Sequence, residues 1–387
     1  MLIAHLILAA IAVGALVATR PGRRLPTVVA ALAATVDLAL GAPLRPALMV
    51  SGPLLLFLTA ALTLASLVER SGLAERLAAA LASAARGSAL LLYVLVCALC
   101  GLLTAAVSLD GAVVLMVPLL LVLARRFRAP FAPLFLGAVV VANAASIAVP
   151  QGNPTNLVII ARLGLSPAAF VAHMLAPGVS AAIVCAAAVA LLQRRALTAR
   201  VALAGRGRAP LSAGERHAAL SLSLAAIVAW AAPLLGIAPW WPFAGAVALA
   251  LLTERRRPRL VVPWNIGIQV SALVVVTSAL HVTVALPTTT GLGVLLVVAA
   301  LIGLACATLN NLPVSVWAAG LLSATGPAYA ASIGLAVGSL ATSQGSVATL
   351  IAVQLAGSGA PRLSARRLAP IAAAGLVAAT TTLWAML

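Results

Sequence analysis

Charge is scarce in this 387-residue chain. Only 8% of the residues are charged, lysine is absent, and there are six acidic side chains, whereas charged residues make up about a quarter of an ordinary soluble domain. Apolar residues account for 64% of the sequence, and the mean hydropathy is +1.19. This composition excludes a soluble globular fold and predicts an integral membrane protein.

Sequence motifs of catalysis and ATP binding are also missing. No His-Glu-x-x-His, Gly-x-Ser-x-Gly or Walker pattern occurs, so we expect no enzyme, and any use of ATP would require a partner protein. Cysteines occur only inside apolar runs, which argues against a disulfide framework. They are Cys97, Cys100, Cys185 and Cys306.

The apolar runs predict helices. Many approach or exceed the ~18 residues of a transmembrane helix, and none alternates as a barrel strand does. The formal net charge of +18 would suggest nucleic acid in a soluble protein, but the arginines gather in short loops between apolar runs, where they set membrane orientation. We therefore expect an all-α polytopic membrane protein, with the lipid bilayer and not nucleic acid as its surroundings.

The arginine-rich loops orient the chain. Residues 2–18 form the first predicted helix, and Arg20, Arg23 and Arg24 follow it. Because positive loops stay in the cytoplasm, we expect the N-terminus outside a bacterial cytoplasmic membrane. This first run is followed, not preceded, by cations, so we interpret it as a retained helix and not a signal peptide. Further helices are expected at 26–42, 48–68 and, lying on the membrane surface, 71–87.

A short apolar leg predicts a re-entrant hairpin. Residues 88–107 enter the bilayer, a polar tip follows at 108–111, and only thirteen apolar residues remain before Arg125. Thirteen residues of helix rise roughly 20 Å, short of the ~30 Å hydrocarbon core. A hairpin that turns inside the membrane and returns to the cytoplasm explains both the short leg and the arginines at each end.

After this hairpin, a helix at 131–149 meets a polar break at 150–156, and a helix at 168–192 returns to the cytoplasm.

The second half repeats this plan with the opposite arginine flanking. Later, a hairpin with its tip at 309–313 has no flanking arginine, so it is expected to enter from outside, and a second break follows at 342–346. The remaining helices are expected at 218–236, 239–253, 264–285, 291–308, 328–341 and 370–387.

Four polar interruptions in hairpin, break, hairpin, break order predict two inverted-topology repeats, each with a re-entrant hairpin and a broken transmembrane helix. The predicted divisions are N-terminal helices at 1–45, a first repeat at 46–193, an arginine-rich cytoplasmic connector at 194–217 and a second repeat at 218–387. The two halves also show local sequence similarity. At the tips, AVSLDGAVVLMV resembles CATLNNLPVSVW, and at the breaks, VPQGNPTNLVII resembles TSQGSVATLIAV.

The first break is a candidate site because unwound backbone at membrane depth is tolerated only in protein or beside a water-filled cavity. Gly152 and Pro154 interrupt the helix, which leaves free N–H groups at one end and free carbonyls at the other. Asn153, Thr155 and Asn156 add neutral donors and acceptors. The alternative is a packing kink whose side chains cap one another.

Asp110 is the one acid at a predicted intramembrane tip. A carboxylate withdrawn from water there is suited to take up and release a proton, or to help hold a cation. The alternative is a cap for the leg that begins at Gly111. Asn310 and Asn311 at the other tip cannot carry a proton and are expected to be ligands or caps.

The predicted substrate-binding residues are those at the tips and breaks: Ser108, Gln151, Gly152, Asn153, Thr155, Asn156, Thr308, Asn310, Asn311, Ser343, Gln344, Gly345 and Ser346. No metal site is predicted. Thiols bind soft ions, so Cys97, Cys100 and Cys306 are weak candidates for such a contact, with filling of helix contacts as the alternative.

Six short motifs occur in order: ERSG at 69–72, LDGA at 109–112, TNLV at 155–158, PWNI at 263–266, NNLP at 310–313 and GSVATL at 345–350. Through them the chain resembles the arsenite-antimonite efflux permeases of the ArsB type, from about residue 54 onward. These belong to the ion-transporter superfamily, which also holds dicarboxylate and citrate carriers and sodium-proton antiporters. The chain departs from the resemblance at Leu109, where the family has Asn, and in the more polar VPQGNP segment.

The resemblance implies proton-coupled efflux of arsenite or antimonite, with Asp110 as proton carrier, no cofactor, a proton or sodium as coupling ion, a homodimer, and a cytoplasmic ATPase partner in some members. Two alternatives stay open: a sodium- or proton-coupled carrier of organic or inorganic anions, and a sodium-proton antiporter. A dicarboxylate would usually require a cation near the midplane, and no arginine lies at the four interruptions.

Overall fold

The computed structural model describes residues 2–18, 24–45, 70–203, 212–231, 262–279 and 287–387, with scattered residues at 46–69 and 241–260. In this part the chain is helical, which confirms the predicted all-α class, and one isolated bridge joins Ser88 and Arg200. Among the described residues, four helices are long and apolar enough to cross a membrane: Ala89–Val107, Phe131–Ala148, Pro167–Leu192 and Leu292–Leu309. The expected helix at 239–253 and most of 48–68 lie outside the described residues.

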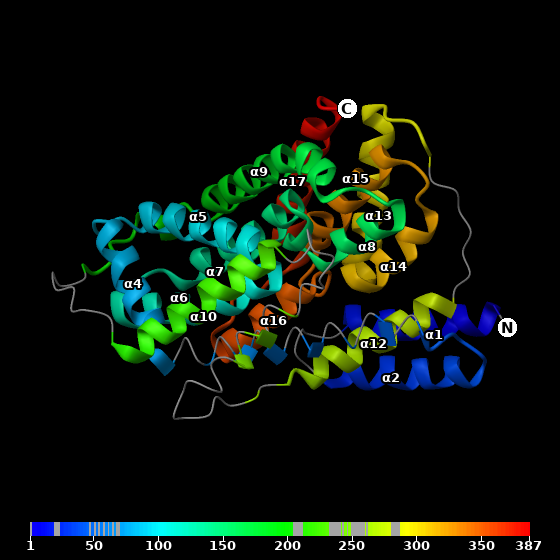
Figure 1. The fold of residues 1–387 in the computed structure, drawn as a ribbon, viewed down its shortest axis with the longest axis horizontal. Helices are drawn as coiled ribbons and strands as arrows, with labels where there is room; N and C mark the ends of the chain where they lie inside the picture. Colours follow the sequence, from blue (N-terminus) through cyan, green and yellow to red (C-terminus); the bar gives the residue numbers. More distant parts are fainter. Residues whose placement is uncertain are drawn as a thin grey trace.

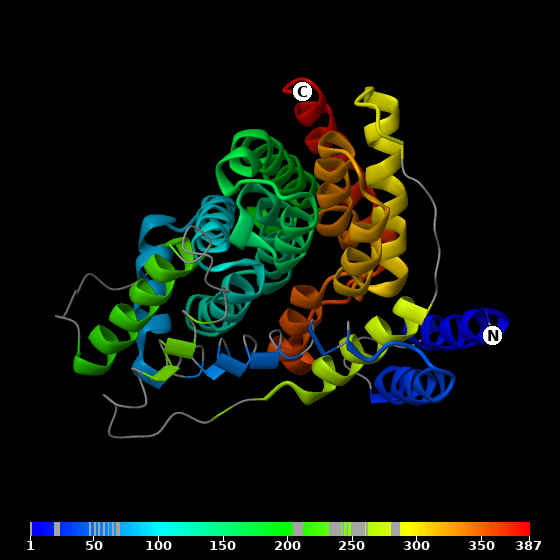
Figure 2. The same cartoon turned by 45° about the vertical axis from the view of Figure 1, so that its right-hand side comes forward.

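Three helices form a layer along one side of the molecule: α1 (Leu2–Ala18), α2 (Arg24–Ala39) and α12 (Trp264–Ala279) (Figures 1 and 2). Inside it, His5 Nδ1 lies 2.6 Å from Asp37 Oδ1, and Asp37 is fully buried. Thr27 donates to Gln269 at 3.4 Å. The layer therefore holds a buried acid–histidine pair that the sequence did not single out.

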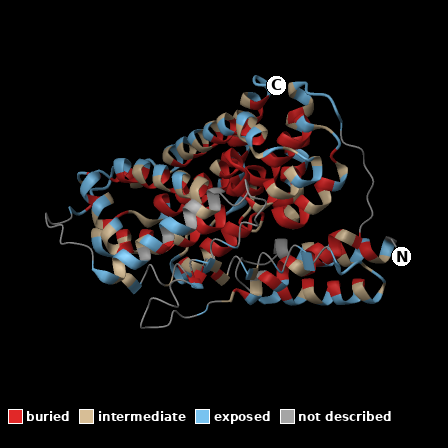
Figure 3. Ribbon diagram, in the orientation of Figure 1, coloured by how far each residue is buried: buried red, intermediate tan, exposed pale blue. Residues whose placement is uncertain are grey.

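The first half is built from six helices: α4 (Leu73–Ala84), α5 (Ala89–Val107), α6 (Leu109–Phe127), α7 (Phe131–Ala145), α8 (Pro154–Leu163) and α9 (Pro167–Leu192). The second half contains α10 (Ala213–Ala231), α13 (Leu292–Leu309), α14 (Asn311–Leu321), α15 (Thr325–Ala336), α16 (Val347–Ala356) and α17 (Ala365–Trp384). Helices α7 and α15, which lead to the two breaks, are buried on nearly every side, and Figure 3 shows this burial at the centre of the molecule.

The α5–α6 hairpin begins and ends at one place. The N–H of Val201 donates to the carbonyl of Gly87, before α5, and the N–H of Ala202 donates to the carbonyl of Phe127, at the end of α6. Two adjacent residues thus clamp both ends of the hairpin. In the second half, a Cβ on Gly326 would lie 2.6 Å from Thr290 Cγ2, so the start of α13 likewise lies beside the start of α15.

Both predicted polar tips are shorter than expected. A single residue, Ser108 or Asn310, separates the two helices of each hairpin, because its side chain caps the next helix at once. Leu109 to Gly111 are therefore the first turn of α6, which is 19 residues long instead of the predicted thirteen.

The predicted connector at 194–217 is partly helical. Helix α10 begins at Ala213 because Ser212 and Glu215 form a capping box: the N–H of Glu215 donates to Ser212 Oγ at 3.2 Å, and the N–H of Ser212 donates to Glu215 Oε2 at 2.7 Å. Glu215 also accepts from Arg76 Nε at 3.0 Å, which joins α10 to α4. Hydrogen bonds from the Ser212 backbone and from Arg76 lower the pKa of Glu215.

Candidate functional site

Each hairpin turns on a residue with strained backbone. Ser108 has φ 103° and ψ 164°, and Asn310 has φ 87° and ψ 149°. Such angles are readily adopted only by glycine and cost about 1–3 kcal/mol for other residues. Each side chain offsets part of this cost by capping: Ser108 Oγ accepts from the N–H of Gly111 at 3.3 Å, and Asn310 Oδ1 from that of Leu312 at 3.2 Å. Strain kept at two matched points is typical of a functional site.

The two breaks share one backbone conformation. The first contains extended residues at Val149 (φ −137°) and Asn153 (φ −146°), and the second at Thr342 (φ −135°) and Ser346 (φ −128°). Both pairs are four residues apart, and a short 3-10 turn precedes each one. The predicted break at 342–346 lies between the 3-10 turn Gly338–Ala341 and α16, whereas the predicted break at 150–156 runs into α8, which begins at Pro154 because Asn153 caps that helix.

A glycine holds each break closed. A Cβ on Gly152 would lie 2.4 Å from the carbonyl oxygen of Ser146, and one on Gly345 would lie 2.1 Å from that of Ser339. Each glycine follows its serine by six residues. Because contacts this short are not made by real Cβ atoms, only glycine permits either fold-back.

Asparagine side chains support the first break from within. Asn153 Oδ1 accepts from the N–H of Thr155 at 3.1 Å, and its Nδ2 donates to Ser146 Oγ at 3.2 Å. Asn156 Nδ2 donates to the carbonyls of Ser146 and Val149 at 2.9 and 3.0 Å. The capping alternative is therefore correct for these amide nitrogens, and what remains for a ligand at these residues is oxygen.

Each break is tied to its own hairpin. Gln151 Nε2 donates to the carbonyl of Ala105 at 3.3 Å, and Thr342 Oγ1 donates to the carbonyl of Ala307 at 2.7 Å. Both acceptors lie three residues before the turn residue of their hairpin. A movement of either hairpin tip would therefore pull on the adjoining break.

The second tip is held more firmly than the first. Asn310 Nδ2 donates to the carbonyl of Gln344 at 2.7 Å, and the N–H of Asn311 donates to the carbonyl of Gly345 at 2.8 Å. The Ser108 side chain and backbone, by contrast, bond to Thr104, Gly111 and Ala112 within their own hairpin. The tip and the break of the second half are therefore joined directly by hydrogen bonds.

The two halves meet through the helices that leave these interruptions. Helix α6 packs against α16, and α8 packs against α14 (Figure 1). Each contact pairs a helix that starts at a hairpin turn with one that starts at a break in the other half. Helices α6, α8, α14 and α16 thus each begin at one of the four interruptions, and helix N-termini carry free N–H groups and a partial positive charge.

Buried oxygen atoms without hydrogen-bond donors gather on the same segments. They are Asp110 Oδ1, Thr155 Oγ1, Asn156 Oδ1, Asn311 Oδ1, Ser346 Oγ and Thr349 Oγ1. An unsatisfied buried polar atom costs about 1–3 kcal/mol. The carboxyl and amide oxygens of this set are suited to a ligand that supplies protons or positive charge, and its three hydroxyl groups can either accept or donate. Sequence reasoning missed Thr349; the signal was its position three residues after Ser346, which repeats the spacing of Asn156 after Asn153.

Asp110 is the second residue of α6 and is 2% exposed. The cap of this helix is Ser108, so the alternative in which Asp110 is the cap was wrong. Among the described residues the ion pairs are His5–Asp37 and Arg76–Glu215, and neither includes Asp110. The site thus contains a buried carboxyl group with no counter-ion from the described part of the chain.

Some of the predicted site residues make contacts within their own segment or with a neighbouring helix. The hydroxyl of Thr308 donates to carbonyls of its own helix, at Leu304 and Ala305. Ser343 is buried and Gln344 is half-buried within the second break. Cys100 Sγ donates to the carbonyl of Ala138 at 3.2 Å.

The thiols do not form a metal site in the described part. No group there of three His, Cys, Asp or Glu side chains could hold a metal ion. Cys97 lines an apolar groove on the far side of α5, and Cys306 is buried in α13. The soft-ion contact predicted for Cys97, Cys100 and Cys306 therefore gains no support from their placement.

Comparison with protein families gives one match. The model of the family described as "Citrate transporter" (CitMHS) matches residues 8–341, which include both hairpin turns and the first break. No curated protein matches the chain. The family lies in the ion-transporter superfamily that the motifs indicated, which confirms a membrane transporter at that level. Because the match covers most of the sequence, the protein belongs to the citrate transporter family of secondary transporters.

Proposed function

We propose that the protein carries a small carboxylate-type anion across the membrane by alternating access, coupled to a proton bound at Asp110. The observation that carries the proposal is the combination of four helix N-termini with a buried carboxyl group that has no counter-ion among the described residues. Helix N-termini attract anions, and the carboxyl group supplies a place for a cation.

The helix N-termini substitute for a missing cation. The described residues at the turns and breaks include no arginine or histidine, so a carboxylate would be bound by backbone N–H groups and helix dipoles. Such groups are preorganised and favour negative charge without a buried guanidinium. Matched turns and breaks in the two halves support the inverted-repeat architecture, whose hairpins and broken helices we propose to surround the substrate at the bilayer midplane.

The unpartnered oxygens support cation coupling. Asp110 can take a proton from one side and release it on the other as the hairpin tips change their exposure. The hydroxyl and amide oxygens of Thr155, Asn156, Asn311 and Ser346 are donor-free in the described structure, and they would also suit sodium, the alternative coupling ion.

Uptake of labelled citrate into proteoliposomes tests the proposal, with an inward proton gradient, an inward sodium gradient, or neither. We expect proton-driven accumulation by the native chain. Asp110→Asn should reduce this accumulation about 100-fold, the scale of a lost proton-transfer group, while citrate binding persists. Asp37→Asn is the matched control, because Asp37 is also a buried acid but is paired with His5; it should retain proton-driven uptake.

Accumulation driven by a sodium gradient alone would show that the coupling ion is sodium and not the proton. Loss of citrate binding in the folded Asp110→Asn protein would place Asp110 in the substrate site instead of the coupling site. Absence of any citrate movement by folded native protein would contradict the proposal that the substrate is a carboxylate.

Arsenite or antimonite efflux is the second candidate. It is favoured by the neutral character of the oxygen set and by the lack of arginine at the described turns and breaks, because trihydroxy arsenite is uncharged and needs hydrogen-bonding groups only. Proton-driven arsenite movement in everted vesicles, without citrate movement, would establish it. Dissipation of a proton gradient by sodium alone would instead indicate sodium-proton antiport.

A further inference from the structure

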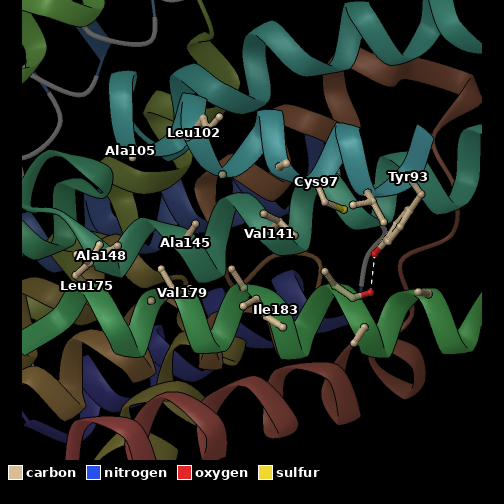
Figure 4. A pocket seen from close by; sticks show the side chains of 18 of the residues that line it. Tyr93, Cys97, Leu102, Ala105, Val141, Ala145, Ala148, Leu175, Val179 and Ile183 are labelled. Atoms are coloured by element: carbon tan, nitrogen blue, oxygen red, sulfur yellow. Dashed lines mark hydrogen bonds between the residues drawn. The ribbon is translucent and has the colours of Figure 1, made fainter. Parts of the chain in front are cut away.

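A long apolar groove runs along the outside of the first half. It lies between α5 and α9, has α7 as its floor, and encloses about 780 Å³ (Figure 4). Its walls include Leu102 on α5 and Val179 and Ile183 on α9, which are 70%, 48% and 63% exposed. Small residues of α7, Ala145 and Val141, form the floor. The groove therefore presents a concave apolar surface to the bilayer.

One end of the groove reaches the candidate site. Ala105 and Ala148 line it there (Figure 4), and Val149, the residue after Ala148, also lines the groove. The carbonyl of Ala105 accepts from Gln151, and the carbonyl of Val149 accepts from Asn156. Whatever fills this end of the groove packs against the backbone that holds the first break.

The other end of the groove is surrounded by arginine. Leu90 and Ala190 line this end, Arg86 precedes Leu90 by four residues, and Arg194 follows Ala190 by four. The backbone bridge between Ser88 and Arg200 places Arg200 beside the start of α5, and Arg195 is the neighbour of Arg194. All four arginines are exposed.

These four arginines form what we call the arginine rim: Arg86, Arg194, Arg195 and Arg200. None of them pairs with a carboxylate in the described part of the chain, where the one arginine–carboxylate pair is Arg76–Glu215. The described acids on helices that pack against α5 are Glu75, Asp110 and Glu215, and Asp110 follows the opposite end of α5 from Arg86. The rim is thus an unneutralised positive cluster at the end of an apolar groove.

We infer that the groove and the arginine rim bind one anionic phospholipid, with an acyl chain along α7 and the phosphate at the rim. The two features match the two parts of such a molecule, and basic pockets at the cytoplasmic ends of helices are suited to anionic headgroups. An uncharged lipid fills the groove but leaves the rim unmatched. The bound chain supports the first break from the membrane side, so this lipid is a structural partner of the transport site.

The test is lipid retention by the purified chain in detergent, measured by mass spectrometry after loading with equimolar phosphatidylglycerol and phosphatidylcholine. We expect phosphatidylglycerol to be retained on the order of tenfold over phosphatidylcholine. Arg194→Gln/Arg195→Gln/Arg200→Gln should abolish this preference. Ile183→Trp, which fills the groove, should lower retention of both lipids.

Matched controls lie outside α5, α7 and α9. Arg24→Gln/Arg45→Gln removes two exposed arginines at the start of α2 and after its end, and Leu304→Trp enlarges a residue that is 66% exposed on α13. Both should retain lipid as the native chain does, and thermal unfolding checks that every variant is folded. Equal retention of the two lipids by the native chain would overturn the proposal. So would a disulfide cross-link between two copies through Ile183→Cys, which would make the groove a dimer interface.

Discussion

The two helix breaks share a backbone but are held differently. Both fold back on a glycine against a serine carbonyl six residues earlier, and both are tied to the carbonyl three residues before their hairpin turn. In the second half, the Asn310 side chain also bonds the backbone of the break, whereas the Ser108 side chain bonds Gly111 within its own hairpin. Only the first tip carries a carboxyl group.

This difference separates two tasks. The second tip is fixed to its break by two hydrogen bonds and carries neutral side chains, so it is suited to hold a substrate in place. The first tip has fewer bonds to its break and carries Asp110, so it is suited to respond to protonation. The two tips therefore share a backbone conformation but differ in side chains, so that one tip is rigid and the other carries a titratable group.

The largest effect is expected at the glycines of the breaks. Gly345→Ala should destabilise the protein by about 3 kcal/mol, the upper range for overpacking, because its Cβ would meet the Ser339 carbonyl at 2.1 Å and that of Cys306 at 3.2 Å. Gly152→Ala should cost less, since its nearest contacts all belong to Ser146. Thermal unfolding measures both, with Gly320→Ala, which has open space around it, as the control. Equal costs at the two breaks would show that the second is no more tightly closed than the first.

Moving the carboxyl group tests whether the two tips are interchangeable. Asn311 is the first residue of α14, whereas Asp110 is the second of α6, and successive helix positions point about 100° apart. Asp110→Asn/Asn311→Asp should therefore keep the roughly 100-fold loss of proton-driven uptake expected of Asp110→Asn. Restored uptake in proteoliposomes would mean that a carboxylate at either tip suffices.

Glycine at the two turn residues should give opposite results. Ser108→Gly relieves strain of about 1 kcal/mol and loses only a cap, for which glycine is a tolerable substitute. We expect it to raise the unfolding temperature. Asn310→Gly also loses the bond to Gln344, worth about 1 kcal/mol, so its stability should be unchanged or lower. Ser108→Ala keeps the strain and loses the cap, so this variant should be destabilised. If it were stabilised instead, the Ser108 cap would not contribute to stability.

The smallest effect concerns the contact between α4 of the first half and α10 of the second. The pKa of Glu215 is lowered by the Ser212 backbone and by Arg76, so the charged carboxylate stabilises the fold at neutral pH. This contribution should be lost as the pH falls below about 4.3, the ordinary value for glutamate. Thermal unfolding at several pH values should show a small acid loss that Glu215→Gln lacks. The exposed control Arg366→Gln should follow the native profile.

Much of the helix order followed from apolar length and arginine placement. The structure agrees with the expected helices at 2–18, 168–192 and 291–308 within about one residue. The second break was placed within its observed bounds, because Gly and small polar residues are sharp interruptions in so apolar a chain. Orientation in the membrane and the re-entrant character of the hairpins remain predictions.

The hydrogen bonds of the candidate residues could not be predicted from the sequence. Periodicity cannot show that Asn153 and Asn156 use their amide nitrogens on the Ser146 region, because those bonds depend on how the chain folds back. Nor could it show that Thr308 bonds its own helix. The His5–Asp37 pair was missed because its partners lie on different helices, 32 positions apart.

The clamp at Val201 and Ala202 fixes an order of events during synthesis. These residues follow α9, yet they close the open ends of the α5–α6 hairpin. The two hydrogen bonds that join the ends of this hairpin can therefore form only after α9 has been synthesised.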